Sequence, residues 1–197
     1  MTLRIGLFGG TFDPVHFGHL MAAEAAREAA DLAEVWFVPV LVPPHKPPPE
    51  ASVRQRLDML ELAIRDVPHF RVEPIELDRP GPSYTIDTIE ALSRRYPDRS
   101  FWLIVGSDMA NDLPGWHRAE ELARRVRFIA LERPGEPVRE DALPEAFRLR
   151  LMRAPMPPVG IASAEIRRRV REGRSIRFYV PEPVREYITG NGLYAKK

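Results

Sequence analysis

The feature that most restricts the fold is an alternation of short apolar runs with longer segments rich in alanine, leucine, glutamate and arginine. Runs typical of buried strands lie at Leu3–Phe8, Glu34–Pro39, Phe70–Glu73, Phe101–Val105 and Arg127–Leu131. Helices are expected between and after them, at Leu20–Leu32, Val53–Arg65, Thr85–Arg95 and Arg118–Arg125. Successive strand, helix and strand form right-handed units with parallel strands. The pattern predicts an α/β fold with a doubly wound, mainly parallel sheet.

The alternation weakens after about Glu136. A short element is expected near Ala146–Met152, and a proline-rich link follows at Ala154–Pro158. Two more helices are expected at about Ala164–Glu172 and Pro183–Ile188. We therefore expect one domain over residues 1–197, with residues 159–197 as a small C-terminal helical annex.

Composition excludes several kinds of chemistry. The chain has no cysteine, so it has no disulfide, thiolate metal site or cysteine nucleophile. A net charge of +1 argues against a broad nucleic-acid surface. No apolar run approaches the roughly 18 residues that span a membrane. We expect a cytoplasmic protein without nucleic-acid or membrane partners; whether it forms a homo-oligomer is left open.

The segments that follow the expected strands are rich in glycine, histidine and proline. They lie at Gly9–His19, Pro39–Pro49, Gly106–His117 and Glu132–Pro137. In doubly wound sheets, ligands bind beyond the carboxyl ends of the strands. The unusual composition therefore falls where the fold predicts a site.

The first of these segments contains a glycine turn. Gly9, Gly10 and Thr11 allow the backbone to approach a phosphate closely, and Phe12 completes the turn. The helix that follows directs its positive N-terminal end at an anion. This arrangement indicates a polyphosphate site.

Two histidines follow the turn. His16 and His19 are three residues apart, a spacing that places both on one helix face, and Gly18 leaves space between them. Both imidazoles could donate to one phosphate group. In the alternative interpretation, Asp13 only caps the helix and the histidines are exposed or core-packing residues. The spacing is too short for a helical zinc pair, so no protein-held metal site is expected.

Taken whole, the segment GGTFDPVHFGHL resembles the signature of the H-x-G-H nucleotidyltransferase superfamily. The resemblance implies a Rossmann-like nucleotidyltransferase fold. It also implies direct attack of a substrate phosphate on the α-phosphate of a nucleoside triphosphate, a reaction that needs no enzyme nucleophile. An enzyme of this kind aligns two anions and stabilises transition-state charge, for which His16 and His19 are candidates.

A proline-stiffened loop, Val42–Pro47, carries Lys46 in a chain with few lysines. Lys46 could place a compact charge on phosphate, or it could be an ordinary solvated residue. The sequence P-P-H-K resembles the superfamily branch that adenylylates nicotinate mononucleotide. That resemblance implies a catalytic Lys46 and a mononucleotide-binding His45.

Two more segments resemble the same branch. In Ser83–Thr88, a helix cap at Ser83 or Thr85 is one interpretation, and the resemblance implies mononucleotide binding by Tyr84 and Thr85. The other segment, Gly106–His117, contains three candidates: Gly106 for close backbone approach, Asp108 for a ribose hydroxyl, and Trp116 for stacking on the nicotinate ring or for core packing.

A fifth segment, Ile161–Arg167, lies near the C-terminus and is expected to contain the start of a helix. Ser163 could cap it, and Arg167 could reach the β- or γ-phosphate and steady the leaving pyrophosphate; a surface helix is the alternative. The branch usually has hydroxyl residues where this chain has Ala162 and Ala164. Arg133, in an R-P-G turn, is a further candidate for the ATP side.

The resemblance covers nearly the whole chain and implies one reaction. ATP and nicotinate mononucleotide would give deamido-NAD and pyrophosphate, with Mg²⁺ neutralising the triphosphate and few protein ligands to that ion. The alternatives are an adenylyltransferase for nicotinamide mononucleotide or phosphopantetheine, and a nucleotide sensor without turnover.

Overall fold

A computed structural model describes residues 2–41, 47–77, 83–132, 135 and 137–196. The described residues form one sheet of six strands: β1 Leu3–Gly10, β2 Glu34–Pro39, β3 Phe70–Val72, β4 Arg99–Gly106, β5 Arg127–Glu132 and β6 Leu151–Pro155. Their order across the sheet is β3-β2-β1-β4-β5-β6, and every neighbouring pair is parallel. The expected doubly wound parallel sheet is confirmed.

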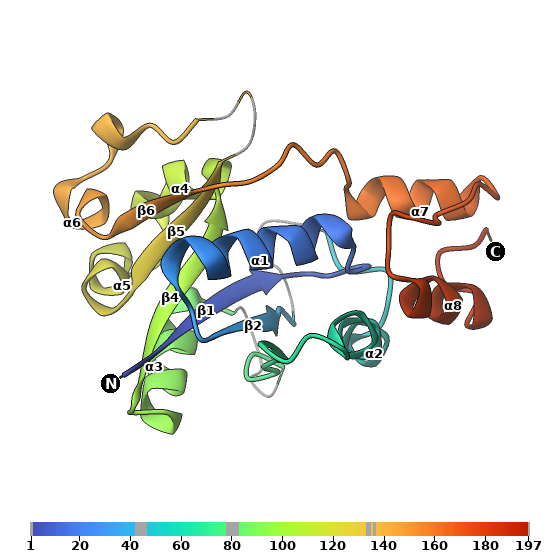
Figure 1. Cartoon of the computed structure of the whole chain (residues 1–197), viewed down its shortest axis with the longest axis horizontal. Coiled ribbons are helices and arrows are strands. Elements are labelled where there is room, and N and C mark those ends of the chain that lie inside the picture. Colours follow the sequence, from blue (N-terminus) through green and yellow to red (C-terminus); the bar gives the residue numbers. More distant parts are fainter. Residues whose placement is uncertain (1, 42–46, 78–82, 133–134, 136, 197) are drawn as a thin grey trace.

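Helices cover both faces of this sheet (Figure 1). The α-helices of the described residues are α1 Phe17–Ala30, α2 Val53–Ile64, α3 Thr85–Arg95, α4 Ser107–Asp112, α5 Ala119–Arg125, α6 Glu145–Arg148, α7 Ser163–Arg171 and α8 Glu182–Gly190. Short 3₁₀ turns are formed by Leu113–Gly115 and Glu140–Ala142.

The unbroken apolar runs are explained by burial on both faces of the strands. In β4, Trp102 and Ile104 pack in the core formed with α1 and α2, whereas Phe101, Leu103 and Val105 pack in the core formed with α3 and α5. Successive side chains of a strand point to opposite faces. A parallel strand between two helical layers therefore needs apolar residues at every position.

The elements differ from the expectation at the start of α1 and near β6, and helix α4 was not expected. Helix α1 begins at Phe17 rather than Leu20, so His16 is its N-cap residue and His19 lies in its first turn. The single element expected near Ala146–Met152 is instead a short helix, α6, followed by the edge strand β6. The sequence signal of β6 is weak because only one of its residues, Ala154, is fully buried.

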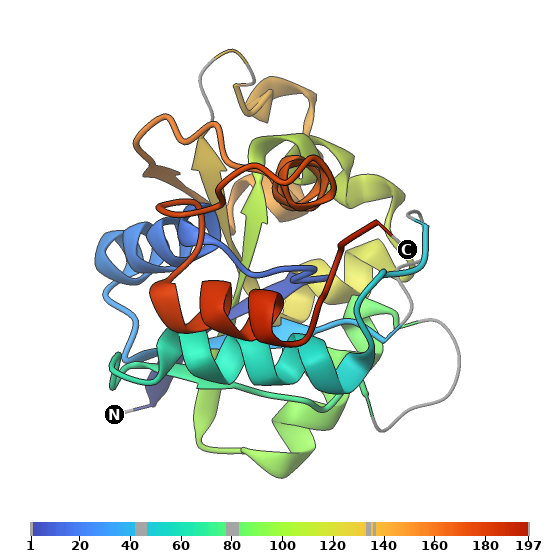
Figure 2. The same ribbon diagram turned by 90° about the vertical axis from the view of Figure 1, so that its right-hand side faces the viewer.

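The C-terminal annex lies at the end of the sheet toward which β1 points, opposite the N-terminus (Figure 1). Helix α8 runs beside α2 (Figure 2), and the Tyr187 hydroxyl donates to Asp58 Oδ2 at 2.7 Å. Ile166 of α7 and Val184 and Ile188 of α8 belong to the same core cluster as α1 and α2. In the described part of the chain, no helix is long and apolar enough to cross a membrane.

Candidate active site

The topology defines where a ligand site should be. β1 and β4 are adjacent at the centre of the sheet, and the chain proceeds from β1 to one edge and from β4 to the other. In open α/β sheets, ligands bind in the crevice outside the carboxyl ends at this reversal of strand order. β1 ends at Gly10 and β4 at Gly106, so two predicted segments start at that point.

The glycine turn at the end of β1 contains glycines with different surroundings. A Cβ atom on Gly10 would lie 2.8 Å from the Phe12 ring, whereas one on Gly9 would meet nothing within 4 Å. Packing therefore requires glycine at position 10, whereas close approach of a ligand to Gly9 stays a prediction. The Phe12 ring is 1% exposed and packs edge-on against His19, so only the backbone of Phe12 can meet a ligand.

The two histidines stack on one another. Their ring centroids are 3.7 Å apart, and the backbone N–H of His16 donates to Nδ1 of His19 at 3.3 Å. This acceptor role leaves the proton of neutral His19 on Nε2, the nitrogen that can donate. A Cβ atom on Gly18 would lie 3.0 Å from Nδ1 of His16, which confirms that Gly18 provides room for this ring.

Asp13 does not cap helix α1. Its carboxylate accepts hydrogen bonds from the backbone N–H groups of Glu50 at 2.8 Å and Ala51 at 3.0 Å, just before α2. The capping interpretation of Asp13 is wrong, because its side chain turns away from α1 toward the segment that follows β2. Asp13 is 3% exposed, and its carboxylate connects the segment Gly9–Leu20 to the residues that directly precede α2.

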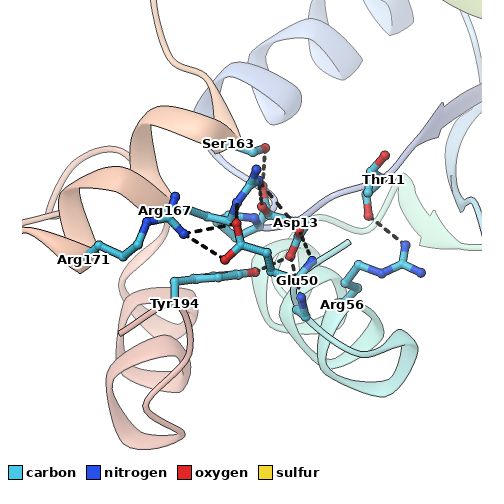
Figure 3. Close-up of polar contacts among 10 residues, drawn as sticks. Thr11, Asp13, Glu50, Arg56, Ser163, Arg167, Arg171 and Tyr194 are labelled. Atoms are coloured by element: carbon cyan, nitrogen blue, oxygen red, sulfur yellow. Dashed lines mark hydrogen bonds and ion pairs between the residues drawn. The ribbon is translucent and has the colours of Figure 1, made fainter. Parts of the chain in front are cut away.

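Arg167 reaches the same segment from α7 (Figure 3). Its Nη1 donates to the carbonyl oxygen of Asp13 at 2.7 Å, and its Nε donates to Glu50 Oε1 at 2.8 Å. Arg171 also contacts the Glu50 carboxylate, at 2.9 Å. The structure thus rejects the interpretation of Arg167 as an ordinary surface residue: two guanidinium groups meet one carboxylate beside the histidine motif.

Ser163 also contacts the motif, but it does not cap α7. The N-cap residue is Ala162, which has no hydroxyl group, and Ser163 is the first helical residue. Its hydroxyl donates to the carbonyl oxygen of Pro14 at 2.9 Å. The capping expectation is therefore wrong, because this hydroxyl joins α7 to the histidine segment instead.

Arg56 was not expected to be part of the site. It is 1% exposed, and its Nη1 donates to the carbonyl oxygens of Thr11 and Val40, each at 2.8 Å. Burial lowers the pKa of this guanidinium, and the charge of Asp13 opposes that shift. Arg56 thereby fixes the backbone that follows β1 and β2. Its position offered a signal, because Arg56 shares the buried stripe of α2 with Met59 and Leu60.

The segments predicted to hold the mononucleotide bring two rings together. Tyr84 is 39% exposed, and its ring centroid lies 4.2 Å from that of His117, which was not a candidate. Trp116 is half-buried and packs against the core of α3 and α5, so core packing accounts for part of its surface. Tyr84 is the N-cap residue of α3 without a side-chain cap, and Thr85 is the first helical residue; the capping alternative is wrong.

The remaining candidates lie at the end of β4 or outside the described residues. Gly106 ends β4 and precedes α4, and Asp108 is exposed in the first turn of that helix. His45, Lys46 and Arg133 lie outside the described residues. Within the described ranges, no group of three or more histidine, aspartate or glutamate residues could hold a metal ion.

Comparison with known proteins identifies the family of the chain. Residues 7–169 match the model of the cytidylyltransferase-like family. The chain is 45% identical over 192 residues to the "Probable nicotinate-nucleotide adenylyltransferase" of Thermus thermophilus, covering 98% of this chain and 100% of that protein. A protein of the same name from Exiguobacterium sibiricum is also 45% identical, with the same coverage of both chains.

Among solved structures, the Plasmodium falciparum nicotinic acid mononucleotide adenylyltransferase complexed with NaAD has a TM-score of 0.82 and 22% identity, covering 98% of this chain and 97% of that one. This similarity supports the fold. The chain belongs to the cytidylyltransferase-like family, a class of nucleotide-binding α/β proteins. Within it, the chain groups with the nicotinate-nucleotide adenylyltransferases.

Proposed function

We propose that this chain transfers the adenylyl group of ATP to nicotinate mononucleotide, giving deamido-NAD and pyrophosphate. The observation that carries the proposal is the histidine pair at the start of α1, with His16 as N-cap residue and His19 in the first turn, just beyond the carboxyl end of the central strand β1. Near-complete coverage of relatives named for this activity, at 45% identity, supports the choice of acceptor.

The reaction is a direct displacement. A phosphate oxygen of the mononucleotide forms a bond to the α-phosphorus of ATP, the bond from that phosphorus to the α,β-bridging oxygen breaks, and pyrophosphate leaves with the electron pair. The protein supplies no nucleophile, so its task is to align two anions and stabilise the developing charge. In this proposal the Nε2–H of His19 and the positive end of α1 act on the α-phosphate.

The leaving group would meet the arginines of α7. Arg167 and Arg171 already bind an anion, the carboxylate of Glu50. The β- and γ-phosphates carry more charge than one carboxylate and could replace it as the partner of these guanidinium groups. The hydroxyl of Ser163 is used on the carbonyl oxygen of Pro14, so we assign it to holding the motif.

The acceptor would bind beside Tyr84 and His117. Their rings lie 4.2 Å apart at an angle of 31°, and their aromatic faces could stack on the pyridine ring. Thr85, the first residue of α3, follows Tyr84 directly. Trp116 has part of its surface available for the same stacking. Contacts of His45 and Lys46 with the substrates stay predictions.

Mg²⁺ enters the proposal as part of the ATP substrate. It would be held mainly by phosphate oxygens and water, as is usual for this strongly hydrated ion. We assign no side chain of this chain as its ligand. The cytoplasmic location and the role of Mg²⁺ also stay predictions.

One assay tests the reaction and the acceptor together. Pyrophosphate release from ATP is measured with nicotinate mononucleotide, nicotinamide mononucleotide or phosphopantetheine, each offered singly with Mg²⁺. We expect the highest kcat/KM with nicotinate mononucleotide. Preference for another acceptor would overturn the substrate assignment. No release with any acceptor, despite ATP binding, would favour a nucleotide sensor.

A further inference from the structure

The C-terminal annex contacts the histidine segment Gly9–Leu20 on both sides of His16, at Asp13 and at Phe17. On one side, the hydroxyl of Tyr194 donates to Asp13 Oδ1 at 2.7 Å. On the other side, the backbone N–H of Phe17, the first residue of α1, donates to the carbonyl oxygen of Tyr179 at 3.0 Å. Together with the contacts of α7 already described, these bonds attach the motif to a part of the chain that carries none of its histidines.

The bond from Tyr194 completes the binding of a buried carboxylate. Asp13 also accepts from two backbone N–H groups, and Arg167 Nη1 lies 3.7 Å from its Oδ2. Tyr194 itself is 8% exposed. Burial, with the charge of Asp13 next, raises the pKa of the Tyr194 hydroxyl above its usual value, so it stays protonated and can donate. Figure 3 shows the tyrosine ring reaching under the Asp13 carboxylate.

A short and well-packed path leads from Asp13 to the histidines. Pro14 and Val15 are both buried, so the backbone between Asp13 and His16 has little freedom to adjust. The backbone N–H of His16 then donates to Nδ1 of His19. A shift of Asp13 would therefore move His16 and, through this bond, reorient His19 Nε2. A displacement of about 1 Å at reacting groups can reduce a rate by roughly a hundredfold.

We propose that Tyr194 is a positioning residue for the His16–His19 pair, acting through the carboxylate of Asp13. This inference rests on the proposed function, because it concerns how the histidine pair is aligned for phosphate attack. Tyr194 does not touch the substrates. Its hydroxyl keeps the segment between the glycine turn and α1 in the position that transfer requires.

The chain contains a matched control for this proposal. Tyr187, on α8, also donates its hydroxyl to an aspartate at 2.7 Å, but its partner is Asp58 on α2, away from the motif. Both tyrosines belong to the C-terminal annex and both connect it to the rest of the domain. The two hydrogen bonds differ in their acceptors: Asp13 belongs to the histidine segment, whereas Asp58 belongs to helix α2.

The test compares Tyr194→Phe with Tyr187→Phe, each of which removes one hydroxyl and keeps the ring. We expect both variants to fold with a similarly lowered Tm. In Tyr194→Phe, kcat with ATP and nicotinate mononucleotide should fall by about tenfold to a hundredfold, while KM for each substrate stays within about twofold. In Tyr187→Phe, kcat should stay within about twofold of the wild type.

A second measurement reports on the imidazole ring of His19. The ¹⁵N NMR shifts of the His19 nitrogens distinguish the tautomer with the proton on Nε2. They should change in Tyr194→Phe and stay unchanged in Tyr187→Phe. Equal kcat values in the two variants, or a raised KM with unchanged kcat in Tyr194→Phe, would overturn the positioning role. If the wild type itself transferred no adenylyl group, the proposed function would fail instead, so the two failures are distinguishable.

Discussion

The histidine segment and the C-terminal annex contribute to the same site in different ways. The segment Gly9–Leu20 is contiguous: the turn, the N-cap residue His16 and the first turn of α1 all lie within twelve residues. The annex reaches it through hydrogen bonds between residues 149, 154 and 181 positions apart. The two histidines proposed for the chemistry are local in sequence, whereas the annex residues that hold their segment in place come from far along the chain.

Removing a proposed chemical group should have the largest effect. We expect His19→Ala to lower kcat for pyrophosphate release by about 10²–10³-fold, because it deletes a donor aimed at the developing charge. Circular dichroism should remain close to that of the wild type, and Tm should fall by only a few degrees, because the main loss is the bond that partly buried His19 accepts at the start of α1. Near-normal turnover would remove the histidine pair from the mechanism.

Arg167 lies in the annex but combines both roles, because it holds the backbone of Asp13 and is proposed to bind phosphate. Arg167→Gln should lower kcat/KM for ATP by about tenfold to a hundredfold, as expected for the loss of a charge-assisted hydrogen bond. Arg168→Gln is the control: Arg168 is on the same helix but pairs with Glu165 and Glu172. Equal losses in the two variants would contradict a specific role for Arg167.

The Tyr194–Asp13 bond should make stability depend on high pH. Because the pKa of Tyr194 is raised in the folded chain, the unfolded chain releases this proton first, at about pH 10. The stabilisation by the hydroxyl is complete below that pH and decreases above it, by up to about 1.4 kcal/mol per pH unit. We expect the free energy of unfolding of the wild type to exceed that of Tyr194→Phe at about pH 8, and this difference to shrink by about pH 11. Urea unfolding measures both free energies, and a difference between wild type and variant that stays constant from about pH 8 to about pH 11 would contradict this prediction.

The smallest expected effect concerns Glu50, which competes with the triphosphate for Arg167 and Arg171. Glu50→Gln removes that charge and retains the backbone N–H that Asp13 accepts. We expect KM for ATP to fall by about twofold to fivefold, the size of a partly exposed ion pair. Glu165→Gln, which affects Arg168 instead, should leave KM unchanged. A higher KM in Glu50→Gln would show that Glu50 supports ATP binding.

The alternation of apolar runs was sufficient to predict the sheet, because parallel strands covered on both faces must be apolar throughout. It failed for β6, an edge strand with a single fully buried residue, Ala154. It also placed the start of α1 too late. His16 and His19 stabilise that helix end through each other, which ordinary capping preferences do not anticipate.

Side-chain neighbours in the candidate site could be predicted where residues follow one another in sequence and were missed where they do not; phosphate binding itself stays a prediction. The segment GGTFDPVHFGHL indicated a phosphate site, and the structure places its histidines together at the end of β1. Asp13 was considered only as a cap, and Tyr194 was not singled out, because a contact across 181 positions leaves no local pattern. Arg56 was also missed, although its position offered a signal, since a charged residue on the buried stripe of a helix requires a partner.

The central claim, direct adenylyl transfer supported by the histidine segment, is tested most directly by following the phosphorus atoms. ATP labelled at the α-phosphate or at the γ-phosphate is incubated with the protein, Mg²⁺ and nicotinate mononucleotide, and the products are separated. We expect the α-label in deamido-NAD, the γ-label in pyrophosphate, and none bound to the protein. Label retained covalently on the chain, or absence of a labelled dinucleotide, would contradict the claim.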